Sequence, residues 1–182
     1  MARISIIFFL IGFNFSAFAQ WRSHYPEGKL SKKNQQKVDN EKNKKSFDAY
    51  FFDALKAKSL EDYKEALKYF EKCIKLDKKN PISFYESAII NTQNSNYEIA
   101  IEQVKTAIKL DSENRWYLLL YAEILFQKQD FNNTAIQYKK LIALETGNEE
   151  LYFKLAETYI YANEFKKAIR VYDDLQKYKG VD

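Results

Sequence analysis

The sequence predicts an all-α protein built as a solenoid of four helix hairpins. Three observations support this fold class. The sequence repeats itself every 34 residues from Phe47 to Asp182, with no insertion or deletion. Each repeat contains two amphipathic stretches of fourteen or so residues. With only four Gly and two Pro in 182 residues, the chain has few residues for tight turns, which favours long helices joined by short polar corners.

Residues 1–19 have the order of a secretory signal peptide. Arg3 gives a positive start, an apolar run follows, and Ala17 and Ala19 supply the small residues of a cleavage site after Ala19. An uncleaved membrane anchor is the alternative. Polar residues interrupt the run, however, and it is shorter than the roughly 20 apolar residues that span a bilayer. We therefore expect an exported protein with no stable transmembrane segment after signal cleavage.

Residues 20–46 are predicted to be a basic, flexible segment. Residues 22–46 carry eight Lys or Arg against three acidic residues, a net charge of +5, and few large apolar side chains. Residues 47–182 carry twenty against twenty-two, a net charge of −2. The folded part has no basic excess, so we expect no nucleic-acid partner. The basic segment is either a linker or a region attracted to the acidic end of an array.

Four repeat units cover residues 47–80, 81–114, 115–148 and 149–182. The eighth position of the unit is always Ala, and the seventeenth is always Tyr or Phe. The twentieth position reads Ala66, Ala100, Thr134 and Ala168. Small side chains at two fixed positions let the axes of two helices approach closely, and an aromatic ring fills the wider space beside them.

Each unit is expected to form two helices with a polar corner between them. In residues 63–76 the apolar side chains recur at steps of three and four, which places them on one helical face. Asn residues precede the second, third and fourth units and favour helix starts, and Pro81 suits a first helical turn.

These columns resemble the tetratricopeptide repeat, and the likeness covers three-quarters of the chain. Departures are Ala in place of Gly at position 8, Thr134 in place of Ala, and no Pro at position 32. The resemblance implies a right-handed superhelical solenoid whose concave groove is formed by the first helix of each unit. It also implies a protein or peptide ligand in that groove.

Ten residues at the family's groove positions are the predicted partner-binding set: Phe51, Leu55, Tyr85, Ile89, Trp116, Glu123, Phe126, Phe153, Glu157 and Tyr161. The aromatic residues are either anchors for a partner or packing between helices. Trp116 is the preferred anchor, because the repeat requires no bulk at its position. We interpret Glu123 and Glu157 as solvated groove charges and not as catalytic acids. Phe51 and Leu55 stand where the chaperone-binding branch of the family carries Lys and Asn, so that branch's clamp on a terminal carboxylate is not expected.

The residue types needed for catalysis are scarce. The only histidine, His24, precedes the repeats, and the sequence has no phosphate-binding loop. The only cysteine, Cys73, occupies a column of apolar residues, which predicts a buried packing role. We expect neither enzymatic activity nor a cofactor nor a metal site.

The fourth unit has no further helix over its last apolar face, so Ile160, Ile169 and Leu175 are expected to face water. This predicts chain continuation or self-association at that end. The leading functional hypothesis is an exported, periplasmic scaffold for protein–protein interaction in the cell envelope. The alternative is the sensor repeat region of a longer signalling protein, and a carbohydrate-binding groove is a third possibility.

Overall fold

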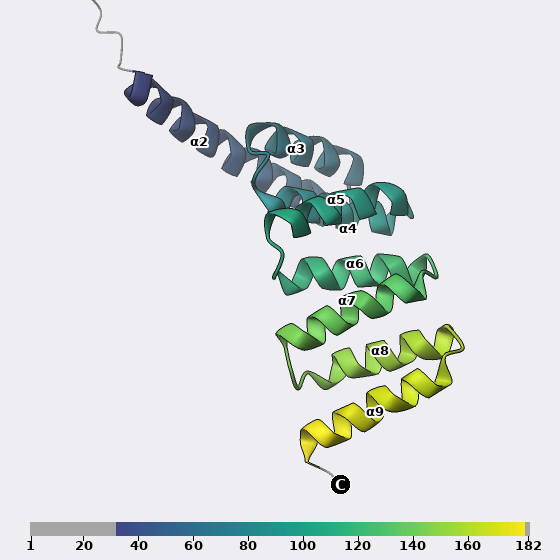
Figure 1. Ribbon diagram of the computed structural model, residues 1–182. Coiled ribbons are helices and arrows are strands. Elements are labelled where there is room, and N and C mark those ends of the chain that lie inside the picture. The colour runs from purple at the N-terminus through teal and green to yellow at the C-terminus, as the bar shows by residue number, and fades with distance from the viewer. Residues whose placement is uncertain (1–31, 181–182) are drawn as a thin grey trace, which may run out of the picture. The chain divides into compact units, whose positions relative to one another are not determined.

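The computed structural model describes residues 32–180, which form eight α-helices and no strand. The helices are α2 (Lys32–Ser59), α3 (Tyr63–Leu76), α4 (Pro81–Gln93), α5 (Tyr97–Leu110), α6 (Arg115–Gln127), α7 (Phe131–Leu144), α8 (Glu149–Tyr161) and α9 (Phe165–Lys179) (Figure 1). The predicted signal peptide, residues 1–19, lies outside the described residues.

The chain divides into two units, one ending at Lys42 and one beginning at Asn43. From α3 onward, each helix of the second unit packs against the helices before and after it, and α4 also contacts α6. Figure 1 shows the helices α4 to α9 stacked one after another as hairpins. The predicted all-α solenoid of helix hairpins is confirmed.

Of the predicted flexible segment, residues 20–46, the structure describes residues 32–46, and residues 20–31 lie outside the described part of the chain. Residues 32–46 belong to α2, and most of their side chains are exposed. Lys, Gln and Glu lose little side-chain freedom in a helix, so a run of them can extend a helix whose later turns are held by packing. Low hydrophobicity reports the absence of a core contact and not the absence of a helix.

The same turn joins the two helices of every hairpin. Glu61, Ser95, Gln129 and Asn163, which are 34 residues apart, all have φ between 57° and 61°. After each of them, a backbone N–H donates to a carbonyl five residues earlier, as from Asp130 N to Leu125 O at 2.9 Å. This left-handed residue and its long hydrogen bond satisfy carbonyl groups at the end of the first helix.

Side chains close the starts of several helices. Asn80 accepts a hydrogen bond from the backbone N–H of Ile82, and Asn114 accepts one from Trp116, both at 3.1 Å. Pro81 is the first residue of α4, where a backbone donor is not needed. The polar residues between the predicted units therefore act as helix caps.

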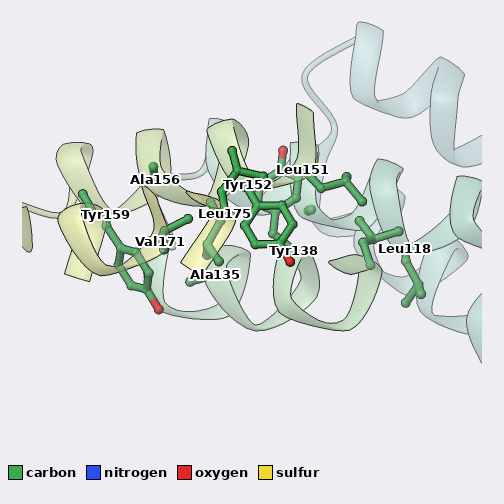
Figure 2. Close-up of a cluster of buried hydrophobic side chains, with 13 residues drawn as sticks. Leu118, Ala135, Tyr138, Leu151, Tyr152, Ala156, Tyr159, Val171 and Leu175 are labelled. Atoms are coloured by element: carbon green, nitrogen blue, oxygen red, sulfur yellow. The ribbon is translucent and has the colours of Figure 1, made fainter. Parts of the chain in front are cut away.

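Three clusters of buried side chains form the core, and all four Ala residues of the eighth-position column are fully buried. The largest cluster joins α6, α7, α8 and α9 and includes Tyr138, Leu141 and Tyr152 (Figure 2). Thr134 is also fully buried, and its hydroxyl donates to the carbonyl of Asp130 at 2.8 Å. The hydroxyl that Thr adds relative to Ala is accommodated there because it finds an acceptor one turn earlier in the chain.

The last hairpin is only partly as expected. Ile160 and Ile169 are 45% and 60% exposed, as predicted, but Leu175 is buried with 6% exposed. Leu175 packs in the cluster with Val171 and Ala168 on the inner side of α9. Its prediction was wrong because α9 buries the whole stripe that faces α8, and Leu175 belongs to that stripe.

Candidate functional site

The first helix of a hairpin leaves one face uncovered. In α8, six residues are buried in the core, among them Leu151, Leu155 and Tyr159. The residues at the predicted groove positions are all exposed: Glu150, Phe153, Glu157, Ile160 and Tyr161. This uncovered face, together with the corresponding faces of α2, α4 and α6, is called the groove face below.

In the first two units most of the predicted groove residues are partly buried. Phe51 is partly buried and meets the ring of Phe70 edge-on, with centroids 5.7 Å apart. Tyr85 and Ile89 are partly buried against the second core cluster, and the ring of Tyr85 lies 4.9 Å from that of Tyr117. Of this set, only Leu55 is exposed.

In the last two units the groove face exposes large apolar side chains. Trp116, Phe153 and Tyr161 are 55%, 48% and 57% exposed. The guanidinium of Arg115 lies 4.7 Å from the centre of the Trp116 ring, which holds that ring by a cation–π contact. Exposed aromatic rings on a rigid helix supply large contact area with little loss of side-chain freedom on binding.

Phe126 and Tyr161 belong to a group of three aromatic rings at the hairpin turns of the last two units. Phe126 meets Tyr161 edge-on at 5.1 Å and Phe131 at 5.6 Å. The ring of Phe131 stacks on Tyr161 at 6.0 Å. Phe126 therefore packs against two neighbouring rings and also forms part of the groove face.

A pocket of about 160 Å³ opens where α6, α7 and α8 meet. We call it the acidic pocket. Its lining residues are Glu123, Phe126, Gln127, Tyr138, Lys154 and Glu157. It brings together three of the ten predicted residues: Glu123, Phe126 and Glu157.

Carboxylates dominate the electrostatics of the acidic pocket. The pKa of Glu123 is raised, chiefly because the surrounding protein removes water from its carboxyl group; Glu150 raises it further and Lys154 lowers it. Among residues 32–180, one ion pair lies within the pocket: the ammonium of Lys154 is 3.9 Å from the carboxylate of Glu157, and both side chains are about half exposed. Near the start of the groove face, by contrast, Lys58 binds Glu86 at 2.6 Å. On the groove face, Glu86 is thus paired with a lysine, whereas Glu123 has no ion-pair partner among residues 32–180.

Tyr138 and Lys154 line the pocket and were not among the predicted residues; Tyr138 is the buried one of the two. It lies on α7, is only 2% exposed, and sits among the core side chains (Figure 2). Burial raises the pKa of its hydroxyl, and the charges of Glu123 and Glu157 raise that pKa further. Its column is a core column of the repeat, so the sequence indicated packing and gave no signal that the hydroxyl reaches a pocket.

Other candidate chemistry is not assembled in residues 32–180. Within that range no group of three or more His, Cys, Asp or Glu residues could hold a metal ion. Cys73 is a buried free thiol, and burial raises its pKa, which confirms the predicted packing position. None of the helices α2 to α9 is long and apolar enough to cross a bilayer.

An array of helix hairpins with an uncovered face of aromatic and acidic side chains defines a class of binding module. The family model described as "Tetratricopeptide repeat" matches residues 41–80. This match, the 34-residue period and the hairpin fold together support the recognition of tetratricopeptide repeats in the chain.

Solved structures of other repeat proteins share the fold. A crystal structure of MamA aligns with a TM-score of 0.66 at 13% identity, over 74% of this chain and 73% of that one. MamA from Desulfovibrio magneticus gives 0.66 at 15% identity, over 73% and 75%. The first repeat domain of Spaghetti (RPAP3), bound to an HSP90 peptide, gives 0.60 at 17% identity, over 65% and 97%. A comparison with curated protein sequences gave no match. The repeats and the fold support a scaffold for protein–protein interaction.

Proposed function

We propose that the chain is an exported scaffold that binds partner proteins along its groove face in the envelope of a Gram-negative bacterium, and that it is not an enzyme. The observation that carries this proposal is the exposure of Trp116, Phe153 and Tyr161 on first helices whose opposite sides are buried. Aromatic residues of this kind dominate binding energy at interfaces. A partner segment that covered them would remove their apolar surface from water.

The chemistry of the groove face favours a ligand unlike the peptide in the RPAP3 structure. That peptide, SRMEEVD, ends in a run with three acidic residues. Here the last two units present Glu123, Glu150 and Glu157 instead of a basic cluster. Acidic groups disfavour an acidic ligand, so a partner with neutral or basic groups is the better match.

Selection of peptides on the full chain tests binding through the groove face. A displayed library of random peptides is enriched on the wild type, and the enriched peptides are then measured against two double variants. Trp116→Ala with Phe153→Ala should weaken binding about tenfold or more, because both changes remove exposed anchors.

The matched control is Ile99→Ala with Ile136→Ala. Both residues are about half exposed and lie on second helices, α5 and α7. This control should bind like the wild type, and helical content by circular dichroism should be unchanged in every variant. Equal loss of binding in both double variants would place the contact elsewhere.

Export is tested separately. The support for it is the order of charged, apolar and small residues in residues 1–19. A fusion of residues 1–46 to alkaline phosphatase should be active in a Gram-negative host, and N-terminal sequencing should find Gln20 first. Ile7→Asp, which interrupts the apolar run, should abolish both results. An alkaline phosphatase fusion that stays inactive when it carries the unchanged residues 1–46 would contradict export.

A further inference from the structure

We propose that the acidic pocket is a receptor for one cationic side chain, Lys or Arg, of a partner peptide lying on the groove face. This deepens the proposed function and rests on it, because it names the chemistry that the groove recognises. The residues that line the pocket include the acidic Glu123 and Glu157 and the aromatic Phe126 and Tyr138.

The size of the pocket suits the end of a side chain. Its 160 Å³ is the volume of roughly five waters in the liquid, whereas sites for whole small molecules occupy about 300 Å³ or more. A guanidinium or ammonium group on its flexible stem fits this space. A nucleotide or other cofactor of that larger class does not.

The charge of the pocket selects a cation. Glu123 and Glu157 line it and Glu150 acts on it from the same helix face of α8, against the single positive charge of Lys154. Glu123 forms no ion pair or hydrogen bond with any residue of 32–180, which leaves its carboxylate free to accept one. Carboxylates bind guanidinium and ammonium groups through short, charge-assisted hydrogen bonds.

Tyr138 gives an independent indication of a ligand. Its side chain is 98% buried, from the 2% that remains exposed, yet its hydroxyl borders the pocket and has no hydrogen-bond partner among the described residues. The fully buried side-chain atoms that lack a partner do not include this hydroxyl, so it keeps contact with water in the pocket, and a ligand can replace that water. Because the hydroxyl oxygen can accept a hydrogen bond, an incoming N–H group satisfies it.

Lys154 competes for the same carboxylates. Its ammonium lies 3.9 Å from Glu157, too long for a strong hydrogen bond, and its side chain is about half exposed. It can therefore swing away when a ligand cation enters. This gives a diagnostic sign, because removing Lys154 should tighten cation binding, whereas removing Glu123 should weaken it.

The phenyl ring of Phe126 completes the site for a cation. Positively charged groups are attracted to the face of an aromatic ring, and the attraction is greatest where water is excluded. An anion would meet the negative face of the ring and three carboxylates, so Lys154 alone does not make this an anion site.

The test uses the full chain and two small probes, N-acetyl-arginine methylamide and its neutral isostere N-acetyl-citrulline methylamide. Binding is followed by shifts of the backbone amide signals of Glu123, Lys154 and Glu157 in a two-dimensional NMR titration. The arginine probe should give saturable shifts at these residues. The citrulline probe should bind about tenfold or more weakly, since it keeps the shape and loses the charge.

Three variants sharpen the test. Glu123→Gln and Tyr138→Phe should each weaken the arginine probe, and Lys154→Gln should strengthen it. Glu71→Gln, an exposed carboxylate on α3, is the matched control and should change nothing. Equal binding of the two probes, or weakening on Lys154→Gln, overturns the proposal.

Two outcomes separate this proposal from the proposed function. If peptides enriched on the groove face carry no Lys or Arg, and the arginine probe does not bind, groove binding stands and the cation receptor is overturned. If probe binding appears only after the lysines of residues 29–45 are changed to Gln, the chain's own basic segment fills the pocket. That result overturns the assignment to a partner. Enriched peptides with one fixed basic position, lost on Glu123→Gln, support the proposal.

Discussion

Replacing Leu141 by Ala should destabilise the last two hairpins strongly, whereas the same change at Leu144 should not. The two leucines lie on α7, one turn apart, but Leu141 is 1% exposed and Leu144 is 45% exposed. Truncation of Leu141 removes buried carbon atoms worth about 0.8 kcal/mol each, or about 2 kcal/mol in all. The cavity left in the largest core cluster raises the expected cost to about 3–4 kcal/mol.

Leu144 keeps much of its surface in water and leaves no closed cavity, so its truncation should cost about 1 kcal/mol or less. Urea unfolding of the full chain, followed by circular dichroism, measures both changes. Because repeats contact only their neighbours, Leu141→Ala should also split the unfolding curve into two transitions. Helices α6 to α9 should unfold in the first transition and the preceding helices in the second. Equal destabilisation by the two variants would refute the packing described for α7.

The structure also predicts the outcome of three further experiments. Gly147 has φ +96°, and a Cβ there would lie 2.6 Å from the hydroxyl oxygen of Tyr178. Gly147→Ala should therefore lower the free energy of unfolding by about 1–3 kcal/mol, measured by thermal unfolding. An unchanged stability would contradict the backbone strain described for this turn. Cys73 is fully buried, with a raised pKa, so an aromatic disulfide reagent should modify it only at the rate of unfolding; fast native labelling would show an open first core. The raised pKa of Glu123 means that its charge costs folding free energy at pH values above that pKa and nothing below its usual pKa, where it is protonated in both states. Glu123→Gln should therefore raise the melting temperature near pH 7 but not at about pH 3. The charged and titratable groups that face Glu123 are Glu150, Glu157, Lys154 and Tyr138. A rise in melting temperature of equal size at both pH values would refute the effect of charge.

The repeat register was readable from the sequence because fold and sequence share one period. The Ala column, the aromatic column and the polar corners each mark a fixed contact in the hairpin, and the structure places a left-handed residue at the same position of all four turns. The identity of those turn residues varies, as Glu61 and Ser95 illustrate. Position in the repeat predicted the corner, whereas residue type alone would not have predicted its conformation.

The groove was predicted only in part, because a position on the helix does not report what the next helix covers. Phe51 and Tyr85 occupy groove positions, yet neighbouring rings of the core hold them. Tyr138 and Lys154 were missed because they lie outside the family's groove positions and reach the pocket by side-chain length. The helical residues 32–46 were missed for a related reason, since nothing packs on them that a hydrophobic pattern could reveal.

Photocrosslinking in living cells of the native host tests the central claim most directly. The photoreactive residue p-benzoylphenylalanine replaces Trp116, Tyr161 or, as control, Ile99, and each full-length variant is irradiated in the cell. The groove-face positions should give the same discrete adduct with a partner protein, and Ile99 on α5 should give none. An adduct at Ile99 with none at Trp116 and Tyr161 would contradict binding through the groove face.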